Sequence, residues 1–232
     1  MNQKTRIFAS TFGAIIALAG LEHGIGEIFQ GYGALEGNMI LSWPNSEFFR
    51  SLGGEPAMTL IPNYLISGIA TFLVSLTLLI WAIGFVHRKG GGWLMILLSV
   101  ILLLVGGGIF PPVFGILIGV VATRINVEAA SPKVSRLAGF RPLLAKLWPW
   151  SYTACILSWL LLIPGVPLID RFTEGDVTTV ILVILLLVFG TLFLTIVSGF
   201  AWDIQVQVST PSITLDSDSR KGQPSAQKPS IV

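Results

Sequence analysis

The sequence runs from Trp93 to Thr123 without a charged residue, and this stretch constrains the fold more than any other. Continued to Ile125 as a single α-helix, it would be about 50 Å long. The hydrocarbon core of a bilayer is only about 30 Å thick. The centre of the stretch, Gly106–Pro112, combines glycines, which weaken a helix, with two adjacent prolines, which lack a backbone donor. The sequence therefore predicts two short helices joined by a turn.

Basic residues flank this stretch on both sides. Arg88 and Lys89 precede it, and five more follow it: Arg124, Lys133, Arg136, Arg141 and Lys146. Lys and Arg concentrate on the cytoplasmic side of membrane proteins. If both flanks are cytoplasmic, the chain crosses and returns as a tight hairpin of helices 93–108 and 113–127. A shallow re-entrant hairpin fits the same charges and remains the alternative.

The remaining apolar segments predict four further membrane helices, over about 7–29, 58–86, 148–169 and 177–202. Only 11% of the residues are charged, too few to coat a water-soluble globule. We therefore expect an all-α polytopic integral membrane protein, a six-helix transmembrane bundle. The transmembrane domain would cover 1–204. Residues 205–232, rich in Ser, Pro, Gln and Asp, would form a disordered cytoplasmic tail.

The distribution of charge predicts the orientation. Of the 14 Lys and Arg residues, all but Arg50 and Arg171 fall on one side of this six-helix arrangement. Both termini are then cytoplasmic, and the expected location is the plasma membrane, with the lipid bilayer as the main partner. The small net charge of +2 gives no indication of nucleic-acid binding. An alternative interprets 1–19 as a cleaved signal peptide, because Lys4 and Arg6 precede a short apolar run that ends in Ala-Leu-Ala.

Two loops carry further expectations. In the outer loop 30–57, Asn45 or Ser46 is expected to cap a short helix that ends at Gly53. That helix would cover the bundle at the membrane interface or act as a lid over a ligand. On the cytoplasmic side, a short amphipathic helix is expected around 132–140.

Apart from Arg124 at the cytoplasmic end of helix 113–127, three charged residues or histidines lie inside the predicted membrane helices: Glu22, His23 and Glu27. Ionisable groups inside a membrane are costly and usually face protein or a water-filled cavity. His23 and Glu27 are four residues apart and share one helical face. A seam of small residues adjoins that face, comprising Gly13, Ala17, Gly20 and Gly24. Such a seam lets another helix approach closely, so the pair is expected to point into the bundle.

Three readings of this polar group stay open. In the first, His23 and Glu27 have a structural role in hydrogen bonds between helices. In the second, they form a binding or proton-coupling site for a transported solute or ion, since histidine titrates near neutral pH. In the third, His23 is a ligand of a metal or a haem. His23 with Glu27 suits a divalent metal, although two ligands are too few for a complete site. Asn63 is a further candidate, either as a cavity-lining residue or as a hydrogen-bonding partner between helices.

No P-loop, HExxH, CxxC or dinucleotide fingerprint is present, so no catalytic residue is predicted, and the sequence leaves any cofactor unknown. The leading functional hypothesis is small-solute binding or transport. The first alternative is a non-catalytic structural or assembly subunit, as a homo-oligomer or with other membrane subunits. The second alternative is a membrane enzyme that uses a metal at His23.

Overall fold

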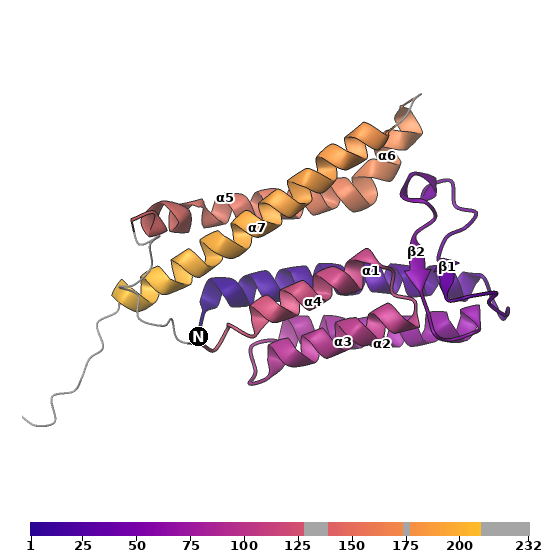
Figure 1. The fold of residues 1–232 in the computed structure, drawn as a ribbon, viewed down its shortest axis with the longest axis horizontal. Helices are drawn as coiled ribbons and strands as arrows, with labels where there is room; N and C mark the ends of the chain where they lie inside the picture. The colour runs from indigo at the N-terminus through magenta and orange to yellow at the C-terminus, as the bar shows by residue number, and fades with distance from the viewer. Residues whose placement is uncertain (128–138, 174–176, 210–232) are drawn as a thin grey trace, which may run out of the picture.

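A computed structural model describes residues 1–127, 139–173 and 177–209 of the chain, which fold into a helical assembly (Figure 1). The helices α1–α4 pack together, and α5 and α7 form a long pair beside them. A small two-stranded sheet lies near the C-terminal end of α1. The elements in chain order are α1 (Gln3–Phe29), β1 (Met39–Leu41), η1 (Arg50–Leu52), β2 (Pro56–Met58), α2 (Tyr64–Gly84), α3 (Gly91–Val105), α4 (Phe110–Ala122), α5 (Arg141–Leu160), η2 (Leu161–Gly165), α6 (Val166–Phe172) and α7 (Thr178–Ser209).

Among the described residues, four helical stretches are long and apolar enough to cross a membrane. They are α1, α2, the continuous run Arg141–Phe172, and α7. The helices α3 and α4 are apolar but have only 15 and 13 residues. At 1.5 Å per residue they are about 22 and 20 Å long, shorter than a typical hydrocarbon core. The protein is therefore mostly helical with four candidate membrane spans.

The predicted hairpin has different helix boundaries from those expected at 93–108 and 113–127. Gly106 and Gly108 adopt left-handed backbone angles, with φ of 116° and 83°, so α3 ends at Val105. Pro111 and Pro112 lie inside the first turn of α4, where a backbone N–H has no helical partner to lose. The prolines therefore begin the second helix, whereas the sequence analysis placed them in the turn.

The predicted start of the helix expected over 58–86 was also wrong. Pro56–Met58 forms β2, which pairs antiparallel with β1 and sets Met39 opposite Met58. The chain becomes helical only after Asn63, whose side-chain oxygen accepts a hydrogen bond from the backbone N–H of Ile66. In the same loop, the expected capped helix is only a single 3-10 turn, Arg50–Leu52. Its predicted end at the left-handed Gly53 is confirmed.

The last two long helices exceed their expected ranges of 148–169 and 177–202. Helix α5 begins at Arg141 and continues through the π-helical turn η2 into α6. Pro164 lies in that turn, and a proline cannot donate the regular helical hydrogen bond. Helix α7 continues to Ser209, past the expected start of the tail at 205. The rest of that tail, and most of the helix expected at 132–140, lie outside the described residues.

Helix α1 lies at the centre because α2 approaches its seam of small residues. Gly13 faces Ala82, Gly20 faces Ser75, and Gly24 meets the backbone of α2 at Gly68 and Phe72. A Cβ at Gly24 would lie 2.8 Å from the backbone nitrogen of Phe72. The predicted close approach of a second helix is thereby confirmed, and it directs His23 and Glu27 inward.

Polar contacts join the N-terminus to the C-terminal part of α7 at one end of the bundle. The Asp203 carboxylate in α7 accepts hydrogen bonds from the backbone N–H groups of Lys4 and Thr5, each at 2.9 Å, and from the Thr5 hydroxyl. These N–H groups belong to the first turn of α1 and have no helical partner. The side chain of Asn2 donates to the carbonyls of Arg124 and Val127. The N-terminus, the turn after α4 and the C-terminal end of α7 therefore meet at this end (Figure 1).

The seam makes a direct prediction about stability. Gly24→Leu places a side chain against backbone atoms of α2, which cannot move aside as the end of a flexible side chain can. We expect the free energy of unfolding to fall by about 1–3 kcal/mol, or the protein to misfold. Gly190→Leu is the matched control, because nothing lies within 4 Å of Gly190 in α7. Size-exclusion profiles and melting temperatures of the two detergent-solubilised variants check this. Equal stability of the two variants would contradict the close α1–α2 contact.

Candidate functional site

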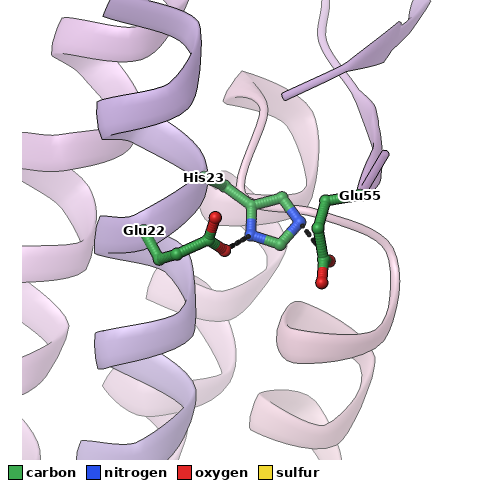
Figure 2. A group of neighbouring side chains, drawn as sticks. All are labelled: Glu22, His23 and Glu55. Atoms are coloured by element: carbon green, nitrogen blue, oxygen red, sulfur yellow. Dashed lines mark ion pairs between the residues drawn. The ribbon is translucent and has the colours of Figure 1, made fainter. Parts of the chain in front are cut away.

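His23 lies between two carboxylates, one from its own helix and one from the loop after η1 (Figure 2). Its Nδ1 atom is 3.0 Å from Oε2 of Glu22, and its Nε2 atom is 3.3 Å from Oε2 of Glu55. The imidazole is only 2% exposed, while both carboxylates are partly accessible. The structure thus brings two of the predicted residues, Glu22 and His23, together with a third that the sequence analysis did not single out.

Glu55 reaches His23 because of an unusual backbone. Three consecutive residues have left-handed angles: Gly53, Gly54 and Glu55, the last with φ of 57°. This conformation is uncommon outside glycine and needs surrounding contacts to hold it. The adjoining hairpin supplies them, since the backbone N–H of Ser42 donates to the Glu55 carbonyl and that of Trp43 donates to the Gly54 carbonyl. A non-glycine residue is held in a costly conformation at the point where its carboxylate meets the buried histidine.

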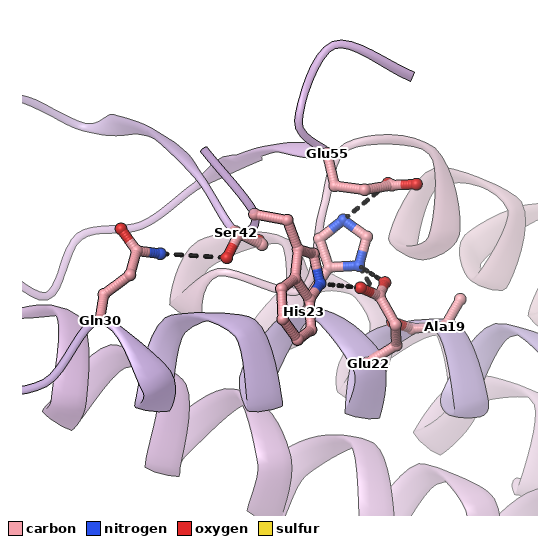
Figure 3. Close-up of polar contacts among 7 residues, drawn as sticks. Ala19, Glu22, His23, Gln30, Ser42 and Glu55 are labelled. Atoms are coloured by element: carbon pink, nitrogen blue, oxygen red, sulfur yellow. Dashed lines mark hydrogen bonds and ion pairs between the residues drawn. The ribbon is translucent and has the colours of Figure 1, made fainter. Parts of the chain in front are cut away.

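The hairpin also holds Glu22. The indole N–H of Trp43 donates to Oε1 of Glu22, leaving Oε2 for the histidine. The Ala19 carbonyl lies 3.0 Å from Nδ1 of His23, and the Gln30 amide donates to the Ser42 carbonyl (Figure 3). The two carboxylates, the histidine and the hairpin therefore form one hydrogen-bonded unit.

The side chains of Glu22, His23 and Glu55 are not arranged as a complete metal-binding site. The ligand atoms of Glu22, His23 and Glu55 lie within 4.8 Å of one another, which brings together enough groups for a metal ion. The carboxylates, however, face opposite nitrogens of the ring, so one ion cannot bind both of them and an unmoved imidazole. Hydrogen bonds to both carboxylates require a proton on each ring nitrogen. The geometry favours a protonated imidazole shared by two carboxylates.

This group forms the polar part of a cavity of about 270 Å³. The rest of the wall is mostly apolar and comes from α4, α5, η2 and α7. It includes Phe110, Phe114, Trp159, Leu162, Ile163 and Ile181. Leu162 and Ile163 belong to the π-helical turn, a type of irregularity that is frequent at functional sites. Binding cavities for small molecules have this character, with a mostly apolar surface and a few convergent polar groups.

The third predicted residue, Glu27, points elsewhere. It is fully buried, and among the described residues neither of its carboxylate oxygens has a hydrogen-bond partner. It packs against Gly106 at the α3–α4 turn and against Gly68 of α2. The candidate metal pair of His23 and Glu27 is therefore not the grouping that the structure forms around the histidine. Asn63, a predicted candidate, acts as the cap of α2.

The glycines of the α3–α4 turn contact both buried ionisable groups. A Cβ at Gly108 would lie 2.6 Å from Nε2 of His23, and one at Gly106 would overlap the Glu27 carboxylate. In the sequence, these glycines indicated only that the first helix of the hairpin ends near them. Their left-handed angles and missing side chains also let the turn close over His23 and Glu27.

Comparison with known proteins identifies no relative: no family model, no curated protein and no solved structure matches this chain.

The role of Glu55 can be tested by chemical modification. Glu55→Ala removes the partner of Nε2 and opens the adjoining cavity, so we expect diethyl pyrocarbonate to modify His23 several-fold faster. Mass spectrometry of the peptide containing residue 23 measures the rate, and His87 provides an internal reference. Glu47→Ala, at an exposed position of the same loop, should leave the rate unchanged. An unaltered rate in Glu55→Ala would show that the carboxylate does not shield the ring.

Proposed function

We propose that this protein is a multi-pass membrane protein that binds a small solute in the cavity beside His23, in a transport-related role. The observation that carries the proposal is the position of Glu22, His23 and Glu55 at one side of a mostly apolar cavity. The alternative of a purely structural subunit expects no cavity at His23, so the cavity that His23 lines favours binding.

The charge of the site indicates the class of solute. Two carboxylates with one imidazolium leave a net charge of about −1, and a neutral imidazole leaves about −2. In a setting of low dielectric constant, such a group attracts a cation or a strong hydrogen-bond donor. The apolar wall suits a hydrocarbon or aromatic body. The solute we propose is therefore a small molecule with an apolar body and a cationic head.

The membrane topology is part of the same proposal. We infer six crossings with both termini in the cytoplasm of a plasma-membrane protein. Support comes from the end of the bundle where Asn2 contacts Arg124. Lys4 and Arg6 lie in the first turns of α1 there, and Arg88 and Lys89 lie near Thr123 and Asn126. The α3–α4 turn lies at the opposite end, where the Leu60 N–H donates to the Leu104 carbonyl beside β2. That position favours a hairpin that passes through the membrane over a shallow re-entrant one.

A ligand series of matched shape tests the solute class. The probes are 2-phenylethylamine, 2-phenylethanol and 3-phenylpropionate, measured by thermal shift and isothermal titration on protein in nanodiscs. We expect the amine to bind most tightly. Glu55→Gln and Glu22→Gln should each weaken it by about tenfold, equivalent to about 1.4 kcal/mol.

Glu47→Gln is the control for this series, because the residue is exposed in the same loop. Equal binding of the carboxylate and the amine, or amine binding that neither site variant weakens, would refute the proposed site. Zinc that binds stoichiometrically and displaces the amine would instead favour the metal alternative at His23.

Cysteine labelling tests the orientation. Cys155, the one cysteine in the sequence, is fully buried and should give little background. Ser46→Cys should react with a membrane-impermeant maleimide on intact cells, whereas Lys89→Cys should react only after permeabilisation. The reverse pattern would invert the topology.

A further inference from the structure

Glu27 is a buried carboxylate that the proposed solute site does not use. It is 0% exposed, both its oxygens lack a hydrogen-bond partner, and no ion pair links it to a basic residue in the described part of the chain. An ionised carboxylate in this environment is very costly unless a positive charge balances it. His23, one helical turn away, is already engaged by Glu22 and Glu55. The structure therefore contains a buried carboxyl group that can stay ionised only with a positive charge beside it.

Oxygen atoms gather beside this carboxylate. The Val105 carbonyl accepts hydrogen bonds from the hydroxyls of Ser67 and Thr71, at 2.7 and 2.6 Å. The Ser67 hydroxyl also lies 2.9 Å from that of Thr59, and all three hydroxyl-bearing residues are buried. Gly106, the next residue after Val105, contacts the Glu27 carboxylate directly. Three helices and the segment after β2 thus deliver one carboxylate, one carbonyl and three hydroxyls to one buried region.

The backbone adds to the negative potential. Helix α3 ends at Val105, so the carbonyl that Ser67 and Thr71 contact lies at the C-terminal end of a helix. The C-terminal end of a helix carries a partial negative charge of about half an electron. In membrane proteins, interrupted helix ends and their free carbonyls are a recurrent way to coordinate sodium ions or protons.

We propose that Glu27, the Val105 carbonyl and the hydroxyls of Ser67 and Thr71 form a binding site for a monovalent cation, sodium. The ligands are all oxygens, which suit a hard cation. The site has one full negative charge, so a monovalent ion makes it neutral, whereas a divalent ion would leave a positive charge buried among apolar side chains.

The turn between α3 and α4 links this site to the cavity. Gly106 contacts Glu27, Gly108 contacts His23, and Ile109 and Phe110 line the cavity. An ion that fixes the Val105 carbonyl therefore also fixes the turn that forms part of the cavity wall. The cation site does not depend on the class of solute, so each proposal can fail without the other.

Thermal unfolding in detergent tests the cation site. Wild-type protein is melted in increasing sodium chloride, with choline chloride keeping the ionic strength constant. We expect a saturable rise of several degrees that choline does not produce. Glu27→Gln should abolish the rise, and Thr71→Val, which removes one hydroxyl at nearly constant volume, should weaken the apparent sodium affinity by about tenfold.

Two controls separate this site from other effects. Glu36→Gln and Glu47→Gln each change an exposed carboxylate and should leave the sodium response intact. If Glu27→Gln does not fold, Thr71→Val decides the matter through its sodium affinity. No sodium response in the wild type, an equal response in Thr71→Val, or stabilisation by acid alone would overturn the proposal.

Discussion

The close contact between α1 and α2 is the constraint on which the rest of the structure depends. Gly24 and Gly68 bring the two backbones together, where an added Cβ on either glycine would clash with main-chain atoms of the other helix. This contact fixes the rotation of α1, and the rotation decides that His23 and Glu27 face protein. A buried ionisable group in a membrane helix is tolerated only when the protein surrounds it with polar atoms. The hairpin, the α3–α4 turn and the Glu55 backbone provide those surroundings.

The two buried groups on α1 are satisfied in different ways. His23 is held by side chains and a carbonyl, with carboxylates at both ring nitrogens and the Ala19 carbonyl beside Nδ1. Glu27 has only hydroxyls, a carbonyl and a helix end in its neighbourhood. The first arrangement is complete within the chain, apart from its opening to the cavity. The second can hold an ionised carboxylate only when a positive charge joins it.

Local patterns in the sequence predicted the part of the site that lies on one helix. The spacing of His23 and Glu27 and the seam of glycines beside them were enough to place both residues inside the bundle. Glu55 and Trp43 could not be predicted, because their roles depend on a hairpin whose strands have only three residues each. Weak local preferences leave such short strands undetermined, and tertiary contacts decide them. The glycines at 106–108 were recognised as a helix end, but their contact with α1 is a long-range property that no local pattern encodes.

The carboxylate of Asp203 places a condition on how the protein matures. It accepts hydrogen bonds from the backbone N–H groups of Lys4 and Thr5 in the first turn of α1, which lie 199 and 198 residues earlier in the sequence. During synthesis these backbone donors of α1 are made well before the carboxylate that they contact. Until α7 has been made, the N–H groups of Lys4 and Thr5 lack this partner. The contact that fixes the N-terminal end of α1 therefore forms late in the folding of the described helices.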